Sequence, residues 1–299
     1  MKRKSFGGWL LVAAVLAGAL IYRLNMAPQT DSSADGSFWV RYLDVGQGDS
    51  ELVQCDGHYM LIDGGTSAYS DTVYAWLKKL NVTHLDYIVC THPHADHAGG
   101  LSGALQFATV GTALAPVKSY DNDEFSDFKK ALKKQGVTIT IPAPGDGFTL
   151  GSANVSVLGP IEKSDDPNDM SIVLRAVYGD TSFLFVGDAQ ADEESDILKS
   201  GRTVQSTVLK VGHHGSETST TAAFLSAVSP QYAVIEAGDN DSYNHPNQGT
   251  LDKLKAAGVT LFRTDLQGTI LCQSDGRTVT FTPEKNADAD VFTKKEQER

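Results

Sequence analysis

The chain has 299 residues, of which 41% are hydrophobic and 21% charged, and this composition excludes a fibrous or intrinsically disordered protein. Its formal net charge is −12. A surface of that sign repels polyanions at long range, which argues against a broad nucleic-acid-binding face but leaves room for a small basic groove. Of the three cysteines, Cys90 lies in an apolar run and is interpreted as a buried small hydrophobe. The sequence does not decide whether Cys55 and Cys272 form a disulfide, because that depends on an oxidising compartment.

The amino terminus carries an export signal. Three basic residues, Lys2, Arg3 and Lys4, precede a nearly uninterrupted apolar run over residues 6–22, which is typical of a secretory signal. The run is too uniformly apolar for an amphipathic core helix, and its length is at the lower limit for crossing a bilayer. Residues 1–27 are therefore predicted to be a signal peptide or a membrane anchor, with the uncleaved anchor favoured. We expect the rest of the chain to lie outside the cytoplasm, either secreted or held at the cell surface.

Composition divides the remainder into three parts. Residues 28–37 are rich in Ser, Asp and Gly and are predicted to be a polar linker. Residues 38–282 contain no further linker and no repeat, so they are predicted to form one domain. The tail, residues 283–299, is charged and has few apolar residues, and we expect it to be disordered.

Short strands and helices alternate through the domain. Strands are predicted at residues 38–45, 50–55, 59–62, 85–90, 155–158, 171–178, 181–186, 208–211, 232–235, 260–263, 269–273 and 278–281. Helices are predicted at residues 70–80, 123–134, 192–199 and 248–257, the first beginning at a Ser70 cap. Strands interleaved with helices favour an α/β fold in which helices pack outside sheets.

The strongest local signal is the segment THPHADH, residues 91–97, which directly follows an apolar strand. It offers four candidate metal ligands within six residues: His92, His94, Asp96 and His97. So dense a group has no packing rationale, because burying these side chains unpaired is costly. Nitrogen ligands with carboxylates suit zinc, and manganese or iron are the alternatives.

Six residues cannot complete two coordination shells, so further ligands must come from distant positions. Asp188 follows an apolar strand and Gly187, where its carboxylate would reach two ions; the alternative is a turn or helix cap. His213 and His214 follow another apolar strand, and if that segment is extended, one of the two faces the metals. Asp63, in the sequence LIDGG, is interpreted as a carboxylate that orients a ligand histidine.

Four other polar residues stand out in the sequence. His58 and His84 lie in a hairpin and a turn, and we expect structural roles for both. His245, in a polar loop before Pro246, is a candidate for contact with the substrate or leaving group. Lys210 lies within an apolar strand, where it would either meet a substrate anion or extend to solvent.

Taken together, these motifs resemble the metallo-β-lactamase superfamily, and more narrowly the extracellular hydrolase domain of the ComEC family of competence proteins. The matching segments are residues 44–50, 61–65, 91–97, 186–188, 209–216 and 243–246. The resemblance implies an αββα sandwich with two divalent metal ions, zinc being the favoured metal, at one edge, here preceded by the anchor or signal helix. It implies one ion on His92 and His94, the other on Asp96, His97 and His214, with Asp188 between them. Asp49 and His213 are then assigned to the surroundings of the ligands.

The sequence departs from the superfamily in one respect. The superfamily usually places another histidine between the first loop and the bridging aspartate, and here no histidine lies between His97 and Asp188. The first ion would therefore keep an open position for water or substrate. Asn168 and Ser171 fall in this interval and are expected to help through hydrogen bonds.

The expected chemistry is hydrolysis by metal-activated water. The leading hypothesis is an exported phosphodiesterase, with a DNA nuclease as its most specific form, and with catalytic roles for Asp96, Asp188, His245 and Lys210. The alternatives are a cell-envelope phosphocholine or teichoic-acid esterase, and a lactonase or β-lactamase, which the missing histidine disfavours. A surface metal-binding module is the non-enzymatic alternative. The expected partners are a phosphodiester of DNA or of an envelope polymer and, through an uncleaved leader, the membrane; no obligate protein partner is inferred.

Overall fold

The computed structural model describes residues 37–238 and 243–294. The predicted signal or anchor segment, residues 1–27, lies outside the described residues, as does nearly all of the linker. Among the residues that are described, no helix combines the length and the apolar character needed to cross a bilayer. All described residues belong to the unit that runs from Ser33 to Arg299.

The first sheet has eight strands in the order β15-β14-β1-β2-β3-β4-β5-β6. Pairing is antiparallel from β15 to β3 and parallel from β3 to β6. The strands are β1 (Phe38–Tyr42), β2 (Glu51–Cys55), β3 (His58–Ile62), β4 (His84–Val89), β5 (Thr109–Leu114), β6 (Ile139–Thr140), β14 (Ile270–Ser274) and β15 (Val279–Pro283).

The second sheet has seven strands in the order β13-β12-β11-β10-β9-β8-β7. It is antiparallel from β7 to β10 and parallel from β10 to β13. The strands are β7 (Gly147–Leu150), β8 (Ala153–Gly159), β9 (Val173–Tyr178), β10 (Thr181–Phe185), β11 (Val208–Lys210), β12 (Tyr232–Ile235) and β13 (Thr260–Arg263).

Helices connect the parallel strands and cover the outer faces of the sheets. On the first sheet they are α2 (Ser70–Lys79), α3 (Ala95–Ala98), α4 (Leu101–Phe107) and α5 (Asp123–Lys134). The later helices are α6 (Ala191–Lys199), α7 (Ala222–Val228), α8 (Gln248–Ala256) and α9 (Thr264–Gln267). The short 3-10 turns are η1 (Ser67–Tyr69), η2 (Asn168–Met170) and η3 (Gly212–Gly215).

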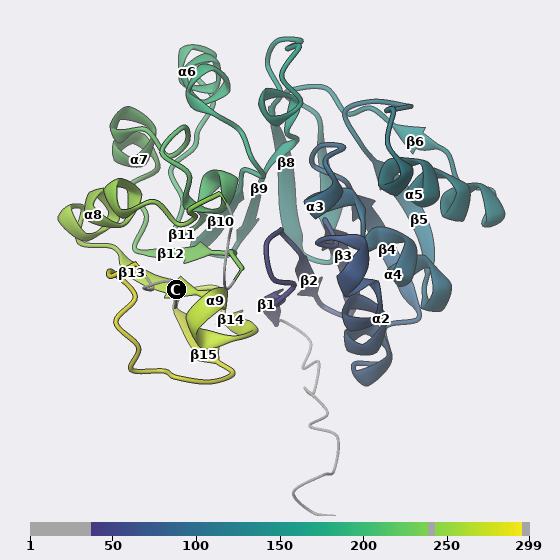
Figure 1. Ribbon diagram of the computed structural model, residues 1–299, viewed down its shortest axis with the longest axis horizontal. Helices are drawn as coiled ribbons and strands as arrows, with labels where there is room; N and C mark the ends of the chain where they lie inside the picture. Colours follow the sequence, from purple (N-terminus) through teal and green to yellow (C-terminus); the bar gives the residue numbers. More distant parts are fainter. Residues whose placement is uncertain (1–36, 239–242, 295–299) are drawn as a thin grey trace, which may run out of the picture. The chain divides into compact units, whose positions relative to one another are not determined.

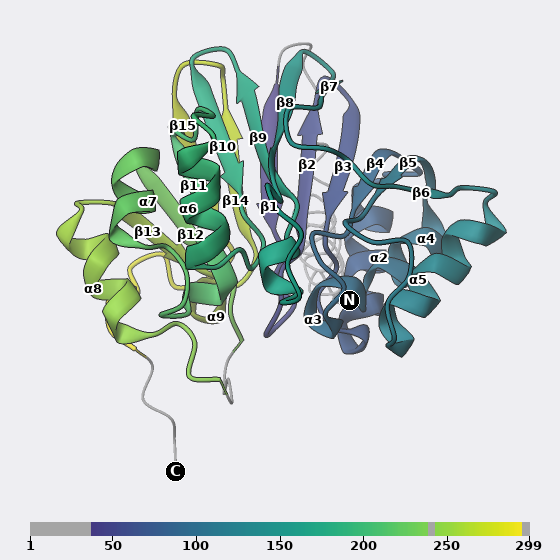
Figure 2. The same cartoon turned by 90° about the horizontal axis from the view of Figure 1, so that it is seen from above.

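Three apolar clusters give the fold its four layers. The central cluster joins the facing surfaces of the two sheets, for example Val40 of β1 and Phe183 of β10. A second cluster lies between the first sheet and its helices, and a third between the second sheet and α6, α7 and α8. Figures 1 and 2 show the two sheets side by side with helices outside each. The predicted mixed α/β sandwich is confirmed to this extent.

The predicted Ser70 cap was wrong, and the open question of a Cys55–Cys272 disulfide is answered. Ser70 does not cap α2 with its side chain, because Tyr69 holds the cap position and Ser70 is already helical. Cys55 and Cys272 are free thiols on the two strands that flank β1, opposite Phe38 and Val40 respectively. The Cα atoms of the two cysteines are separated by two strand spacings, roughly 9–10 Å, which is more than a disulfide can span.

The tail was expected to be disordered from residue 283, but through residue 294 it lies against the domain. The side chains of Val291 and Phe292 pack against the third apolar cluster. The guanidinium of the buried Arg263 donates hydrogen bonds to the backbone carbonyls of Val291 and Thr293. These contacts use backbone groups and two scattered apolar residues, which composition does not reveal.

Candidate metal centre

The histidine loop begins where β4 ends. Its conformation is held by Asp63, which follows β3 and accepts hydrogen bonds from the backbone N–H of Thr91 (2.8 Å) and from the Thr91 hydroxyl (2.5 Å). The loop then turns into α3 at His94. A neighbouring turn packs so closely that a Cβ at Gly48, whose φ is +139°, would collide with the carbonyl oxygen of Asp96. Glycine is therefore required at this position.

The other candidate ligands come from the second sheet. Asp188 lies just beyond β10, and His213 and His214 lie in the turn η3 just beyond β11. Because β10 and β11 are parallel, their carboxyl ends meet at one edge of the sheet. His213 and His214 both have positive φ, 49° and 53°, so the turn is left-handed and not extended as expected. Both rings can therefore face the same side.

The structure brings all six predicted ligands together, and three of them lie around Oδ2 of Asp188. This atom lies 3.2 Å from Nε2 of His97, 3.5 Å from Nε2 of His214 and 3.7 Å from Nε2 of His92. Two further contacts complete the group: His92 Nε2 lies 3.1 Å from His94 Nδ1, and His214 Nε2 lies 3.4 Å from Asp96 Oδ2. One subgroup contains His92 and His94, the other contains Asp96, His97 and His214, and Asp188 contacts both.

These donor atoms fit divalent cations. Nε2 of His97, Nε2 of His214 and Oδ1 of Asp188 are buried and have no hydrogen-bond partner among the described residues. The Nδ1 atoms of both rings are already held: that of His97 lies 2.8 Å from Asp63, and that of His214 lies 3.0 Å from the backbone carbonyl of Glu236. Each ring therefore presents Nε2 to the centre, as a ligand histidine does when its other nitrogen is fixed by a neighbour.

The charges in the centre balance one another. Burial alone would raise the pKa of Asp188, but the imidazoles of His214 and His97 outweigh it and hold that pKa well below its usual value. Burial alone would lower the pKa of His97 and of His214, but Asp188 outweighs it, with Asp63 acting on His97 and Asp49 on His214, so both values are raised. Protons and metal cations therefore compete for the ring nitrogens of His97 and His214.

The remaining predicted residues differ in where they lie. The Ser171 hydroxyl accepts a hydrogen bond from the backbone N–H of Asp188 (3.1 Å) and lies 3.4 Å from Nδ1 of His92, so it contacts the first subgroup and the aspartate that joins the two. Asn168 lies three residues earlier in η2, with its side-chain oxygen buried and without a hydrogen-bond partner in the described part of the chain. The ring of His245 lies 5.3 Å from that of His213 and 6.1 Å from that of His214, centroid to centroid.

Lys210 neither extends to solvent nor faces a substrate site. Its side chain is fully buried, and Nζ donates to Oδ2 of Asp49 (2.7 Å) and to the carbonyl of Val211 (3.0 Å). Asp49 in turn places Oδ1 3.1 Å from Nδ1 of His214. Lys210 therefore supports the centre from behind, through Asp49.

Two buried acids beside this pair, Glu51 and Glu236, were not predicted. Asp49, Glu51 and Glu236 bring carboxylate oxygens within 4.8 Å of one another. Burial and the charge of Asp49 raise the pKa of Glu236 to about 8. Glu236 directly follows the apolar strand β12, the same pattern that singled out Asp188, so the signal was present.

Two side chains before α5 also reach the histidine loop. The side-chain amide of Asn122 donates to the carbonyl of Pro93 (2.8 Å) and its oxygen caps α5. The ring of Tyr120 lies 6.5 Å from that of His94 in an edge-to-face arrangement. Neither residue belongs to a motif, and only the tertiary fold brings them here.

Paired clusters of histidine and aspartate, at the edge where the ends of two sheets meet, define a class of metal-dependent hydrolase. Residues 43–238 match the model of the metallo-beta-lactamase superfamily. The chain belongs to that superfamily.

Its curated relatives include competence proteins. Competence protein ComA of Neisseria gonorrhoeae is 32% identical over 86% of this chain and 34% of its own length. ComE operon protein 3 of Bacillus subtilis is 28% identical over 91% of this chain and 37% of its own length. The chain thus spans about a third of the length of these relatives. It is a metallo-β-lactamase superfamily hydrolase related to competence proteins.

Solved structures share the fold. The metallo-beta-lactamase fold protein YhfI from Bacillus subtilis is 12% identical, with a TM-score of 0.54 over 79% of this chain and 100% of that one. CmlA, a diiron beta-hydroxylase from Streptomyces venezuelae, is 15% identical, with a TM-score of 0.50 over 76% of this chain and 52% of that one. At these identities the likeness concerns the fold alone.

Proposed function

We propose that the chain is an exported phosphodiesterase that uses two divalent metal ions. One observation carries this proposal: Nε2 of His97, Nε2 of His214 and Oδ1 of Asp188 converge in the interior without hydrogen-bond partners among the described residues. Burying such groups is costly unless cations complete them. The proposed ligands are His92, His94 and Asp188 for one ion, and Asp96, His97, His214 and Asp188 for the other.

When bound, the two ions supply Lewis acidity and a water nucleophile that is deprotonated near neutral pH. The chain's own residues position the reactants. Asp63 fixes the ring orientation of His97, and the backbone carbonyl of Glu236 fixes that of His214, with the charge of Asp49 beside it. On the more open side, Nδ1 of His213 lies 3.2 Å from the Thr218 hydroxyl, which leaves Nε2 facing Asp188 at 3.7 Å.

His245 is the proposed proton donor to the leaving oxygen. It lies beside His213 and His214 on that more open side of the centre. An imidazole can act as a general acid and give a proton to a leaving oxygen. Lys210 has no direct part, because its ammonium is buried against Asp49.

Zinc is the proposed metal, with manganese as the alternative, since both accept nitrogen and carboxylate ligands. DNA is the proposed substrate class. The support is that relatives bear the names competence protein and Recombination protein 2, the latter from Haemophilus influenzae. The absence of a third histidine between His97 and Asp188 disfavours a lactonase or β-lactamase site. Hydrolysis of an envelope phosphodiester, such as a phosphocholine or teichoic-acid ester, is the second candidate.

The test is metal content together with a substrate panel. The purified full-length chain should bind about two ions after reconstitution, and Asp188→Ala should lose at least one. It should hydrolyse bis(p-nitrophenyl) phosphate and single-stranded DNA, and a chelator should abolish both activities. Hydrolysis of p-nitrophenylphosphorylcholine without DNA cleavage would favour the envelope substrate, and hydrolysis of a lactone or cephalosporin would favour that class. Bound metal without any hydrolysis would favour the non-enzymatic alternative, a metal-binding module.

Export is proposed from the basic residues Lys2, Arg3 and Lys4 before the apolar run. Protease added to intact cells should then degrade the domain, whereas a cytoplasmic marker should survive. Full protection of the domain in intact cells, with degradation after lysis, would reverse the proposed orientation.

A further inference from the structure

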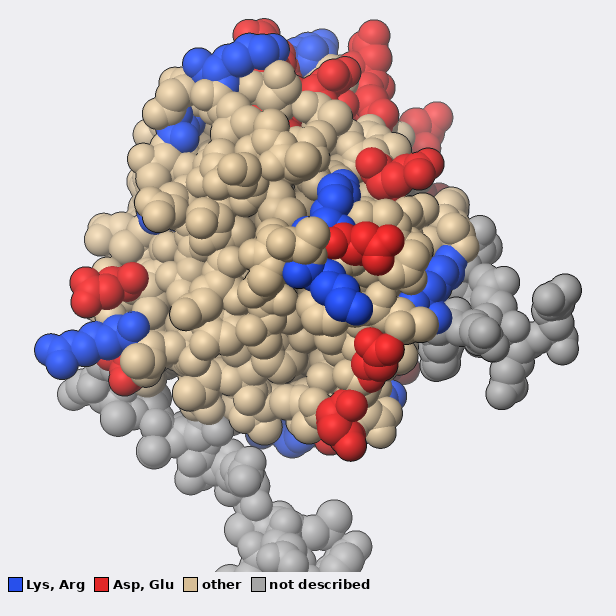
Figure 3. Space-filling view, turned by 90° about the vertical axis from the view of Figure 1, so that its left-hand side faces the viewer, with Lys and Arg blue, Asp and Glu red and all other residues tan. Residues whose placement is uncertain are grey.

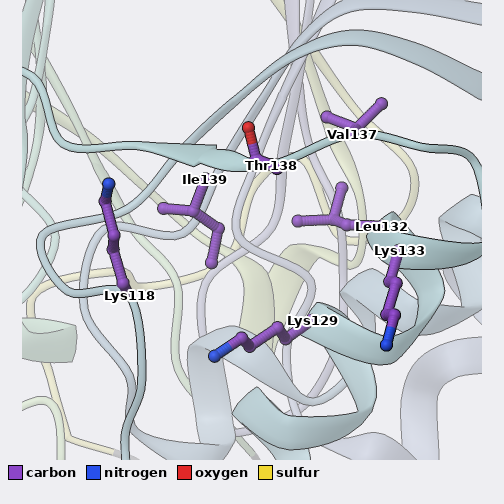
Figure 4. A pocket seen from close by; sticks show the side chains of 7 residues that line it. All are labelled: Lys118, Lys129, Leu132, Lys133, Val137, Thr138 and Ile139. Atoms are coloured by element: carbon purple, nitrogen blue, oxygen red, sulfur yellow. The ribbon is translucent and has the colours of Figure 1, made fainter.

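A pocket of about 480 Å³ lies between α5 and the segment that leads into β6 (Figure 4). Its lining residues are Lys118, Lys129, Leu132, Lys133, Val137, Thr138 and Ile139. Three of the seven are lysines, and none is acidic. The buried side chains of Leu132 and Ile139 form an apolar floor, and Figure 4 shows the lysines arranged around it.

This concentration of positive charge contrasts with the rest of the molecule. The chain carries a net charge of −12. On the face that holds α7 and α8, acidic and basic side chains are interspersed (Figure 3). On α5, Lys130 forms an ion pair with Asp127. Among the described residues, the pocket lysines Lys118, Lys129 and Lys133 form no ion pair. Their ammonium groups are therefore available to an anion.

The pocket is linked to the metal centre by one short segment. Lys118 lies two residues before Tyr120, whose ring contacts His94, and four residues before Asn122, which holds the carbonyl of Pro93. Two residues span at most about 7 Å. The Lys118 end of the pocket therefore lies close to the histidine loop.

We propose that the lysine pocket binds a nucleotide of a single-stranded nucleic acid, a few nucleotides away from the phosphodiester at the metal centre. This proposal rests on the proposed phosphodiesterase function. The lysines suit the phosphates, and the apolar floor of Leu132 and Ile139 suits the face of a base. A polyol phosphate would use the lysines but not the floor, so the nucleic acid is favoured.

The test replaces charge without disturbing the fold. The variant Lys118→Gln/Lys129→Gln/Lys133→Gln is compared with a control that removes the same charge from other helices, Lys78→Gln/Lys199→Gln/Lys255→Gln. Binding of fluorescein-labelled (dT)12 is measured by anisotropy in EDTA, so that no hydrolysis intervenes. A second variant, Thr138→Glu, introduces a negative charge at an exposed position of the pocket.

The pocket variant should bind (dT)12 at least about 10-fold more weakly at low salt, and the slope of log K against log salt should fall by about 2, since each phosphate contact to a single strand contributes about 0.7. Thr138→Glu should also weaken binding, and the control should bind like the parent chain. Hydrolysis of bis(p-nitrophenyl) phosphate should stay within about 2-fold in all variants, because that substrate is too short to reach the pocket.

Several results would overturn the proposal. One is no binding of (dT)12 by the parent chain, and another is equal losses in the pocket and control variants. Loss of binding to poly(glycerol phosphate) with retained (dT)12 binding would assign the pocket to an envelope polymer instead. If the parent chain binds (dT)12 through the pocket yet hydrolyses no phosphodiester, the proposed function fails while the binding site stands.

Discussion

Oδ2 of Asp63 lies 2.8 Å from Nδ1 of His97, and both side chains are fully buried. The contact fixes the ring so that Nε2 faces Asp188 at 3.2 Å. His214 differs in part: its Nδ1 hydrogen-bonds the backbone carbonyl of Glu236, and Oδ1 of Asp49 lies 3.1 Å from the same nitrogen. Each of the two rings is thus held in one orientation through Nδ1 and has a carboxylate beside that nitrogen.

The first prediction concerns Asp63. Asp63→Asn keeps the shape of the side chain but removes the negative charge that makes His97 a better ligand. Metal affinity should fall by about 10–100-fold, measured by competition with a chromophoric chelator. The matched control is Asp86→Asn, which alters an Asp–His pair with the exposed His58 away from the centre. Unchanged affinity in Asp63→Asn would show that the carboxylate does not support the ligand.

The second prediction concerns the buried pair of Lys210 and Asp49. Lys210→Met should destabilise the fold by about 3–5 kcal/mol, because it leaves Asp49 buried without its partner. The free energy of unfolding is measured with urea. The double variant Lys210→Met/Asp49→Asn should recover part of the loss, since no uncompensated charge remains. If Lys210→Met unfolds at the same urea concentration as the parent chain, the pair does not contribute to stability.

The third prediction concerns the pH dependence of stability. Burial, with a contribution from the charge of Asp169, raises the pKa of Glu193 from 4.5 to about 8. The pKa of Glu193 is higher in the folded than in the unfolded chain. The stability that its neutral carboxyl contributes is therefore complete below pH 4.5 and is lost as the pH rises to about 8. The loss is at most about 1.4 kcal/mol per pH unit. Glu193→Gln mimics the neutral acid and keeps an oxygen to accept the bond from the backbone N–H of Ile161.

Glu193→Gln should therefore match the parent chain in urea unfolding at pH 4 and exceed it at pH 8.5. Glu217→Gln, at an exposed position, is the control and should change neither value. A variant that is less stable than the parent chain at pH 8.5 would mean that the ionised carboxylate is favourable where it lies.

Parts of the fold followed from the sequence because they depend on local patterns. The segment 91–97 and the strand before it stand out by residue type alone, and Asp63 was assigned its place behind a histidine from its motif. In contrast, the helix α4 and the strand β5 were not predicted. The helix contains Gly103, where a Cβ would collide with the carbonyl oxygen of Ser70, so close packing and not helix propensity fixes it.

Long-range relations could not be predicted. Lys210 and Asp49 are 161 residues apart in the sequence, and their pairing arises only when the two sheets pack together. The strand pattern predicted that Lys210 contacts either a substrate anion or solvent. In the structure it contacts neither, because it is buried against Asp49. The left-handed turn at His213 and His214 was equally hidden, because positive φ is uncommon for residues other than glycine and asparagine.

The last prediction separates these two histidines. Nε2 of His214 lies within 3.5 Å of both Asp96 and Asp188, whereas Nε2 of His213 lies 3.7 Å from Asp188 and its ring is partly exposed. His214→Ala should therefore lose metal and reduce phosphodiester hydrolysis by a factor on the order of 100 or more, because water activation depends on that ion. His213→Ala should keep its metal and lose less activity, because it acts on the more open side of the centre. Metal content and rate at saturating zinc or manganese, with thermal unfolding to confirm the fold, decide the matter. If His213→Ala strips the metal while His214→Ala retains it, the two roles are reversed and the turn presents the other ring to the ion.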